Sequence, residues 1–600
     1  MQKSSTKIKK RNLIAKEFIE KQRFNLRKLR IFFDSDVPEL TANMKTRLFL
    51  VWGLLTVSGL GLAINLYNLQ IVRGPELRKR ARNQQMVAIR PFIPRRPVLD
   101  RNSQMVAIDR PTYTFYVHPK LFTKSRKDIA QKLAPIINQD AGELENKFEK
   151  KRSGILIAAN LPEEIADQVK ALRLNGLDLT KKYARFYPQQ NLFSEVVGYV
   201  NLDRRGQAGV EYSQEKLLER SSKTLRISRK GNGLLMSDRA PQGFLNADDL
   251  RVQLTVDSRL QRSARTALAA QMKKFRAKRG AVIVMDAWDG SILAMASQPT
   301  YNPNEYSKAD ISLFRNWTVA DLYEPGSTFK PINVALALEA GVIQRNTVFH
   351  DSGLVKVDGW PIRNATLRGN GSINIAEILQ TSSNVAMVHM MRRLKKDDYY
   401  RRLQALEIDQ KTGIELPGEV RGRLKSEKVF MERSIEVATS SFGQGFALTP
   451  MKLVQLQGAL ANGGKLVTPH LVKGLVDVEG TLHWQPKYPT KQIFSPEVSQ
   501  TVVELMQTVV DKGSAAKTEN YRIGGKTGTA QKAGPRGGYL PNAKITSFVS
   551  IFPVESPKYV VLVLVDEPQG ANTYGSTVAA PVAKFVIDAL ISLKGIPPSK

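Results

Sequence analysis

The sequence contains no cysteine and only five histidines among its 600 residues. The missing cysteines exclude disulfide bonds, thiolate nucleophiles and thiolate zinc sites, and they leave the redox compartment undetermined. No histidine lies close in sequence to the serine motif described below, so the base for such a serine is expected from another residue type. The histidines are His118, His350, His389, His470 and His483.

Acidic residues are also scarce, since 55 Asp and Glu stand against 90 Lys and Arg and leave a net charge of +35. The basic excess is spread along the whole chain, and no recognised nucleic-acid module accompanies it. We therefore expect no nucleic-acid partner and favour an anionic membrane surface or polymer. Hydrophobic residues make up 42% of the chain, which is typical of a folded protein with several domains.

Residues 48–72 form a run without any charge, LFLVWGLLTVSGLGLAINLYNLQIV, bounded by Arg47 and Arg73. About 20 apolar residues span a bilayer core, so the run predicts a single transmembrane helix. A cleaved signal peptide fits poorly because its apolar run is usually ~7–15 residues long, and a buried core helix is the alternative. The flanks do not set the orientation, because residues 28–47 hold four Lys and Arg and residues 73–92 hold six.

The chain divides at the anchor and near residue 245. Residues 1–47 form a basic tail with a potential amphipathic helix at 13–33, which is either solvated or docks on lipid or a partner. Residues 73–245 mix short strand and helix patterns without a recognisable active site, which predicts a spacing and docking domain. Residues 246–600 form the third region.

The third region has strands early and late in its sequence, with helical patterns between them. Asp289-Gly290 predicts a hairpin turn, and strands begin at Ile545 and Lys558. A helix over 578–593 follows. The pattern predicts an α/β (α+β) domain with one sheet whose halves are separated in sequence and whose faces carry helices.

The segment YEPGSTFKP places Ser327 three residues before Lys330, at a helix start marked by Pro331. The two side chains share one helix face, and the apolar run that follows predicts a buried helix. Burial lowers the pKa of a lysine, and a neutral amine can accept a proton from a serine hydroxyl. A surface helix cap is the alternative interpretation of this short motif.

Two further segments favour catalysis. TSSNVA offers Ser382 and Asn384 between two helical patterns, although loops between helices also use Ser and Asn as caps. GGKTGTAQ places Lys526, Thr527 and Gly528 just before the late strands, where glycine permits close backbone approach. Either segment alone is also compatible with an ordinary cap or turn.

Together, and in this order, S-x-x-K, S-x-N and K-T-G resemble the signature of the penicillin-recognising serine acyltransferases. The chain is similar to class B penicillin-binding proteins of the division type over roughly residues 45–595. The resemblance implies a peptidoglycan D,D-transpeptidase acting in septal wall synthesis and acylated by β-lactams. It also implies an antiparallel five-stranded sheet flanked by helices, after an elongated pedestal and one membrane anchor.

The resemblance further implies individual roles. Ser327 attacks the carbonyl of the penultimate D-alanine, and Lys330 accepts the serine proton. Ser382 relays protons to the leaving amine, and Asn384 holds the substrate amide and Lys330.

On the late strand, Lys526 supplies a positive field. Thr527 and Thr529 bind the terminal carboxylate of the substrate, with Gly528 between them. The backbone N–H groups of Ser327 and Thr529 form the oxyanion hole.

The family also implies partners and a location. The expected partners are peptidoglycan stem peptides, β-lactam antibiotics, the membrane, and a polytopic division glycosyltransferase with other division proteins; no metal or organic cofactor is expected. The protein is expected in the inner (plasma) membrane as a single-pass protein, with a cytoplasmic N-terminus and an extracytoplasmic catalytic domain. The alternatives are an elongation-type transpeptidase, a carboxypeptidase or β-lactamase of the same fold, or a silent division scaffold.

Two features leave local questions. Arg96 and Ser103 stand in RRPVLDRNSQ where the family commonly has glycine, which puts the local turns in doubt. FGQGF, residues 442–446, either shapes the cleft or is an ordinary loop, and we favour the loop.

Overall fold

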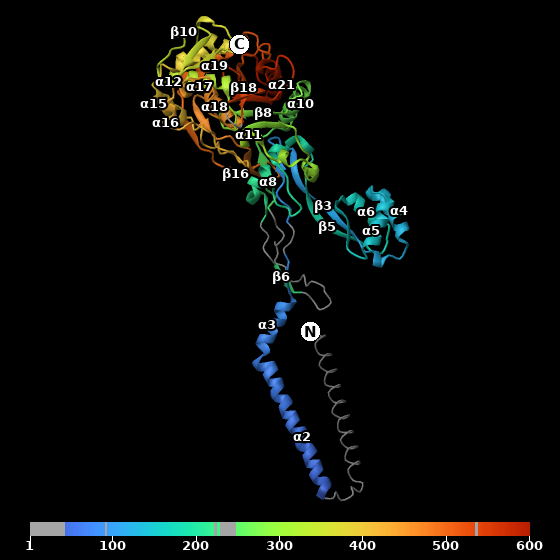
Figure 1. Cartoon of the computed structure of the whole chain (residues 1–600). Helices are drawn as coiled ribbons and strands as arrows, with labels where there is room; N and C mark the ends of the chain where they lie inside the picture. Colours follow the sequence, from blue (N-terminus) through green and yellow to red (C-terminus); the bar gives the residue numbers. More distant parts are fainter. Residues whose placement is uncertain (1–41, 90–92, 221–224, 229–247, 535–537, 600) are drawn as a thin grey trace, which may run out of the picture. The chain divides into compact units, whose positions relative to one another are not determined.

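The computed structural model describes residues 42–89, 93–220, 225–228, 248–534 and 538–599. These residues fall into two compact units, of which one holds 42–89 and 225–228 and the other holds the rest (Figure 1). The expected amphipathic helix at 13–33 lies outside the described residues.

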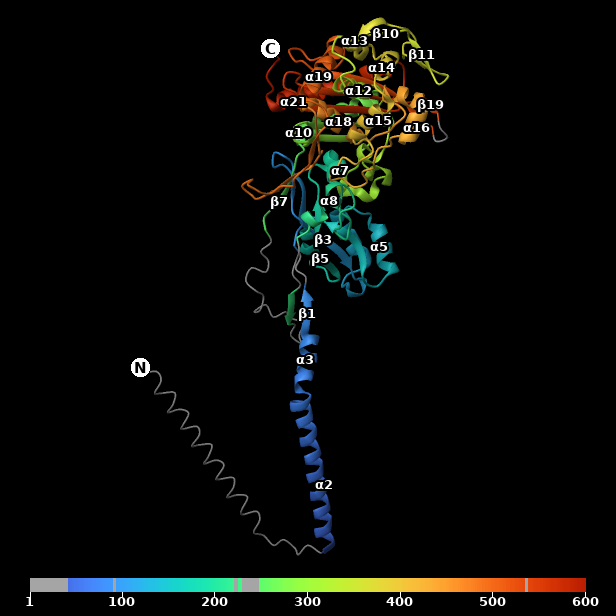
Figure 2. The same ribbon diagram turned by 90° about the vertical axis from the view of Figure 1, so that its left-hand side faces the viewer.

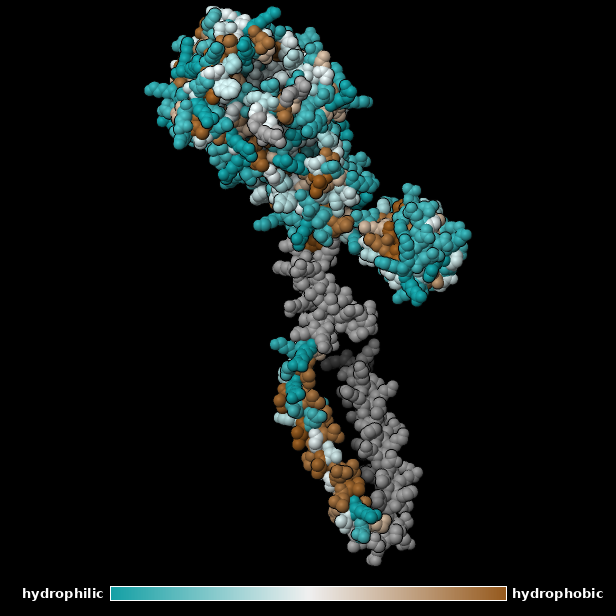
Figure 3. All heavy atoms as spheres, in the orientation of Figure 1, coloured by the Kyte–Doolittle hydropathy of each residue, from teal (hydrophilic) through white to brown (hydrophobic). Residues whose placement is uncertain are grey.

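The first unit is mainly one apolar helix. Asn43–Val72 is by length and composition able to cross a membrane, and none of its hydrophobic window is buried. Figure 3 shows hydrophobic side chains exposed along this helix. A core helix of a soluble domain would be mostly buried, so the exposure favours the predicted anchor. The elements of this unit are α2 (Ala42–Tyr67), the π-helix η1 (Asn68–Val72), α3 (Gly74–Gln85), and β1 (Met86–Ile89) paired with β6 (Leu225–Ser228).

The second unit contains a pedestal sheet built on β3 (Met105–Val117). This strand pairs with β4 (Ile155–Leu161) and β5 (Leu177–Phe186), and three helices pack on this part of the sheet around Phe115 and Phe148 (Figure 1). The helices are α4 (Arg126–Ile137), α5 (Ala141–Lys150) and α6 (Glu163–Ala171).

The other end of the same sheet is built from distant parts of the chain. Its order runs β16-β15-β7-β2-β3-β4, so strands from beyond residue 246 join strands that precede it. No local sequence pattern announces such pairing, because the partners are far apart in the chain. These strands are β2 (Val98–Leu99), β7 (Arg251–Leu254), β15 (Val472–Val476) and β16 (Leu482–Trp484).

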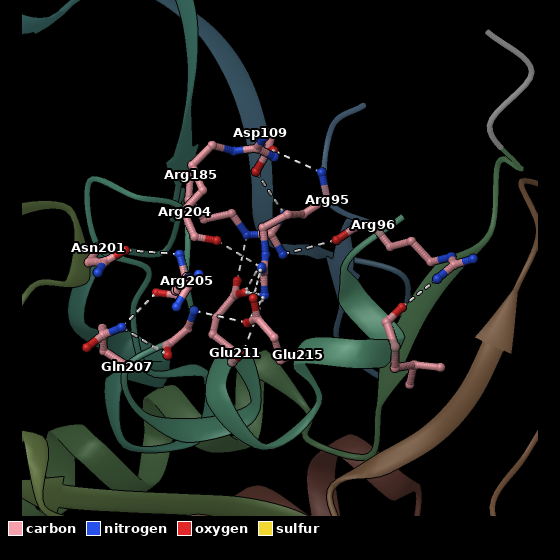
Figure 4. A network of polar contacts seen from close by, with 12 residues as sticks. Arg95, Arg96, Asp109, Arg185, Asn201, Arg204, Arg205, Gln207, Glu211 and Glu215 are labelled. Carbon is pink, nitrogen blue, oxygen red and sulfur yellow. Dashed lines mark hydrogen bonds and ion pairs between the residues drawn. The ribbon is translucent and has the colours of Figure 1, made fainter. Parts of the chain in front are cut away.

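Buried ion pairs hold the pedestal together (Figure 4). Arg185 on β5 donates to Asp109 on β3 at 3.2 Å and to Glu211 on α8 (Gly209–Ser213) at 2.6 Å. Arg95 donates to Glu211 at 3.0 Å and to Glu215 at 2.9 Å. Each arginine therefore has carboxylate partners, as buried charges require.

The turn in RRPVLDRNSQ forms although Ser103 stands where the family commonly has glycine. Ser103 adopts φ +63°, the left-handed conformation that glycine usually supplies, and the Asp100 carboxylate accepts backbone hydrogen bonds within the turn. Arg96, at the other position where the family commonly has glycine, donates from its side-chain Nε to Asp248 at 3.0 Å.

The sheet of the third region has the predicted five antiparallel strands, ordered β18-β19-β20-β8-β9. Strands early and late in the region meet where β20 pairs with β8, and Gly290 takes φ +85° in the predicted hairpin. The strands are β8 (Arg279–Asp286), β9 (Ile292–Gln298), β18 (Gly524–Ala533), β19 (Tyr539–Phe552) and β20 (Tyr559–Asp566).

Helices cover both faces of this sheet (Figures 1 and 2). Every residue of β20 is buried, and alternate side chains enter two separate cores: Val560 and Leu562 on one face, Val561 and Val563 on the other. The first core includes α12 (Lys330–Glu339), α18 (Pro450–Ala461) and α19 (Pro496–Asp511), and the second includes α10 (Ser258–Lys274) and α21 (Ala580–Lys594).

Candidate active site

The serine and lysine of the first motif lie at the start of the buried helix α12. A 3-10 turn, η7 (Gly326–Phe329), carries Ser327, and α12 begins at Lys330 with Pro331 in its first turn. Lys330 is completely buried, whereas Ser327 is partly exposed. Ser327 is thus partly accessible to solvent, while the Lys330 amine stays away from water.

Ser382 and Asn384 of the second motif reach Lys330 from the junction of α13 (Ile375–Thr381) and α14 (Asn384–Met391). Ser382 caps α13 in the left-handed conformation, with φ +55° and ψ +37°. Lys330 Nζ donates to the Ser382 backbone oxygen at 2.6 Å and to Asn384 Oδ1 at 2.8 Å, and it lies 3.2 Å from Ser382 Oγ.

The Ser382 hydroxyl is the centre of the cluster. Its Oγ lies 2.9 Å from Ser327 Oγ and accepts a hydrogen bond from Lys526 Nζ at 3.1 Å. Lys526, on edge strand β18, is also completely buried. Within the described residues, Ser382 joins Ser327 to both lysines, and no hydrogen bond links Ser327 Oγ directly to Lys330 Nζ.

Both lysines are shifted toward the neutral amine. Burial lowers the pKa of Lys330 well below its usual value, and the Lys526 charge lowers it further, although Asp351 acts in the opposite direction. Burial lowers the pKa of Lys526 to about 7. Neither lysine forms a salt bridge within the described residues.

The K-T-G strand packs directly on the serine segment. A side chain at Gly528 would place its Cβ 2.9 Å from Thr328 Cγ2 and 2.4 Å from Ser547 Oγ, so both side chains would have to move to admit it. Thr527 is partly exposed and Thr529 is exposed. Both hydroxyl-bearing residues are therefore accessible at the strand edge beside Ser327.

The prediction for FGQGF was wrong, because Gly443 packs against the segment that carries Ser327. Gly443 has φ +81°, its carbonyl accepts from the Gly326 N–H at 2.8 Å, and a Cβ at this position would lie 2.1 Å from the Gly326 oxygen. The close contact with the residue before Ser327 excludes any side chain. The repeated glycines carried this signal, but the contact partner lies more than 100 residues away in the sequence.

Two further side chains escaped prediction. Glu324 accepts from the Gly445 N–H at 3.0 Å and from the Tyr539 hydroxyl at 2.8 Å, and it thereby links the serine segment to β19. Asn364 accepts from the Asn384 N–H at 2.9 Å. Isolated Glu and Asn residues carry no sequence signal for such contacts. In the described part of the chain, no three His, Cys, Asp or Glu side chains cluster closely enough to hold a metal ion.

Comparison with known families decides the assignment. Residues 280–588 match the penicillin binding protein transpeptidase domain, and residues 93–235 match the penicillin-binding protein dimerisation domain. The chain belongs to the class B penicillin-binding proteins. Its site lies within the matched transpeptidase domain.

Named relatives share this assignment over most of their length. The chain is 40% identical to the peptidoglycan D,D-transpeptidase FtsI homolog of Mesostigma viride, over 92% of this chain and 97% of that protein. It is 34% identical to the stage V sporulation protein D of Bacillus subtilis, over 85% and 80%. It is 28% identical to the peptidoglycan D,D-transpeptidase FtsI of Escherichia coli, over 84% of each.

Two crystal structures have the same fold as this penicillin-binding protein. A peptidoglycan synthetase from Bifidobacterium adolescentis has a TM-score of 0.65 at 23% identity and covers 86% of this chain and 98% of its own. Penicillin binding protein 3 from Mycobacterium tuberculosis, complexed with aztreonam, has a TM-score of 0.63 at 22% identity, over 84% and 97%.

Proposed function

We propose that this penicillin-binding protein cross-links peptidoglycan stem peptides during septal wall synthesis, with Ser327 as the acyl-transferring nucleophile. The observation that carries the proposal is the cluster of one accessible hydroxyl, Ser327, joined through Ser382 to two completely buried lysines. The names of the relatives support the reaction and the division role. β-Lactams acylate the same residue, Ser327.

The hydrogen bonds of Ser382 define a proton path. In the structure the Lys330 amine donates to the Ser382 backbone oxygen, to Asn384 Oδ1 and to Ser382 Oγ. Once it is neutral it keeps two N–H donors for the first two oxygens and presents its lone pair to Ser382 Oγ. The Ser382 hydroxyl, which in the structure donates to Ser327 and accepts from Lys526, then donates to that lone pair and accepts from Ser327. As Ser327 attacks, its proton passes to Ser382, and the Ser382 proton passes to Lys330.

Acyl transfer then proceeds in two steps. Ser327 Oγ bonds to the carbonyl carbon of the penultimate D-alanine, the bond to the terminal D-alanine nitrogen breaks, and Lys330 returns its proton through Ser382 to that nitrogen. The amine of a second stem peptide attacks the ester, and its proton follows the same path to Lys330 and back to Ser327. No net proton is gained or lost.

The β18 strand binds the reacting peptide. Thr527 and Thr529 hold the terminal carboxylate in the positive field of Lys526, and Gly528 permits the close approach. The N–H groups of Ser327 and Thr529 stabilise the oxyanion; loss of one such donor typically costs ~10²–10³-fold in rate.

The substrate lies outside the cytoplasm, and this determines the orientation that the flanking charges leave open. The N-terminus is cytoplasmic, Asn43–Val72 crosses the inner membrane, and the second unit is extracytoplasmic. A polytopic division glycosyltransferase and other division proteins bind the anchor and pedestal. A reporter fusion that places residues 250–600 in the cytoplasm would refute this orientation.

Labelling with a fluorescent penicillin tests the function. The wild type is expected to form a long-lived covalent adduct at Ser327, detected by intact-protein mass, whereas Ser327→Ala and Lys330→Ala form none. Turnover of the adduct within seconds would identify a drug hydrolase instead. An unlabelled wild type would refute the enzyme assignment.

A further inference from the structure

A buried amide stands behind the S-x-N loop and is not part of the three motifs. Asn364, only 4% exposed, follows β12 (Trp360–Arg363). Its Oδ1 accepts from the backbone N–H groups of Asn384 at 2.9 Å and Val385 at 3.2 Å. It therefore ties the first residues of α14 to the preceding hairpin.

The other end of the Asn364 amide is held by a buried carboxylate. Its Nδ2 donates to both oxygens of Asp351, at 2.9 and 2.8 Å. Asp351, on β10 (Val348–Asp351), is 1% exposed and also accepts from the Gly353 N–H at 2.9 Å. Because a carboxylate only accepts, it fixes the flip of the amide and directs Asn364 Oδ1 toward Asn384.

The hairpin also fixes the Asn384 side chain. Asn384 Nδ2 donates to the Arg363 backbone oxygen at 3.0 Å, so Oδ1 turns toward Lys330 Nζ at 2.8 Å. An unbroken series of bonds runs from the buried carboxylate through two amides to the catalytic amine. The adjoining Ser382 occupies its left-handed conformation at one end of the same loop.

We propose that Asp351 and Asn364 are positioning residues for acyl transfer, with Asp351 orienting the Asn364 amide and Asn364 holding the Ser382–Asn384 loop in register with Lys330. This inference rests on the function proposed above. Neither residue touches the reacting atoms. Their effect is on the geometry of the groups that do.

The first test compares two buried asparagines. Asn364→Ala in the full-length protein, in detergent micelles, is expected to lower the rate of acylation by fluorescent penicillin ~10–100-fold, because displaced catalytic groups lose rate steeply. The matched control is Asn462→Ala, since Asn462 is also buried and its side chain makes three backbone hydrogen bonds, to Ala287 and Lys465. The control is expected to lower thermal stability while the folded protein keeps the wild-type rate.

The second test uses pH and retains the side-chain shape. Asn364→Asp keeps an acceptor for the Asn384 N–H but sets a carboxylate against Asp351, so the orienting donor is lost. Two facing carboxylates share a proton as the pH falls, and the protonated form restores the donor. As the pH is lowered from about 8 to about 5, the ratio of the variant's acylation rate to the wild-type rate is expected to rise. Among the described residues, Lys330 and His389 interact electrostatically with Asp351, and both are unchanged in the variant.

The outcomes separate this inference from the proposed function. A wild type that penicillin does not label refutes the function itself. Normal labelling of wild type, with wild-type rates for folded Asn364→Ala, refutes only the positioning role. Equal rate losses in Asn364→Ala and Asn462→Ala, or a pH-independent ratio for Asn364→Asp, also refute it. If Asn364→Ala does not fold, the pH ratio of Asn364→Asp decides.

Discussion

The pedestal and the active site both bury cationic side chains, but the pKa values of these side chains are shifted in opposite directions. Burial alone would lower the pKa of Arg95, yet its bonds and charge interactions with Glu215 and Glu211 raise it above the ordinary value. Lys330 and Lys526 are also buried and, among the residues that the structure describes, bond only to neutral oxygens, and the pKa of each is lowered.

The difference lies in the partners, not in the burial. A buried arginine with carboxylate partners stays charged and joins segments of the chain, which suits a support. A buried lysine without such partners is easily neutralised, and a neutral amine can accept a proton. Desolvation thus accompanies ion pairs that stabilise the pedestal, and it favours neutral, proton-accepting lysines in the active site.

Making the charge of Lys330 permanent is expected to have the largest effect. Lys330→Arg keeps the positive charge but cannot supply a neutral nitrogen, so acylation by penicillin falls by ~10²–10⁴-fold. Stopped-flow measurement of the acylation rate checks this. Lys452→Met is the control, since Lys452 is also buried, with a pKa lowered by burial to about 8, but lies outside the cluster; it should acylate normally. A Lys330→Arg variant that acylates at the wild-type rate would show that a neutral amine at this position is not required.

Removing the pedestal's central carboxylate comes next. Glu211→Ala leaves Arg95 and Arg185 short of partners and is expected to cost about 3–5 kcal/mol in the free energy of unfolding. Calorimetry gives the loss in Tm. The folded variant should acylate at the wild-type rate, and a large loss of rate without a loss of stability would contradict the assigned role.

Lys526→Met is expected to raise thermal stability at neutral pH while it lowers the rate of acylation. The folded-state pKa of about 7 lies below the usual 10.5, so the unfolded wild type binds more protons and its stability falls as pH drops from 10.5 toward 7. The variant escapes this penalty, and its Tm should exceed that of wild type at neutral pH and converge with it near pH 10.5.

The same variant should acylate more slowly, and its activity should require higher pH. Loss of the Lys526 charge raises the pKa of Lys330, so the neutral base forms only at higher pH. A pH–rate profile of acylation measures the displacement. An unchanged rising limb would show that the two amines do not interact.

The smallest effect is expected at the pedestal surface. Arg96→Gly restores the family's glycine and removes a partly exposed pair with Asp248, which should cost less than ~1 kcal/mol. Unfolding in low and high salt tests this, because screening should shrink the difference between variant and wild type. A loss as large as that of Glu211→Ala would show that exposure does not separate the two kinds of ion pair.

Local patterns sufficed for the elements and for the three motifs. The charge-free run, the Asp289-Gly290 turn and the alternating late strands each correspond to the helix, hairpin and sheet that form. Failures arose where a partner was remote. The interpretation of Gly443 missed its contact with Gly326, and nothing around Asn364 indicated its bond to Asn384.

The amino-acid sequence by itself determined which groups the protein possesses: an apolar helix, a serine one turn from a lysine, and a second lysine on a late strand, because these depend on composition and on spacing along one segment. Only the tertiary structure decided that Ser382 stands between the hydroxyl and both amines, and that in the described part of the chain the two lysines lack carboxylate partners while the two arginines have them. Those outcomes depend on which distant segments share a dry interior, since desolvation and hydrogen bonding act through space and not along the chain.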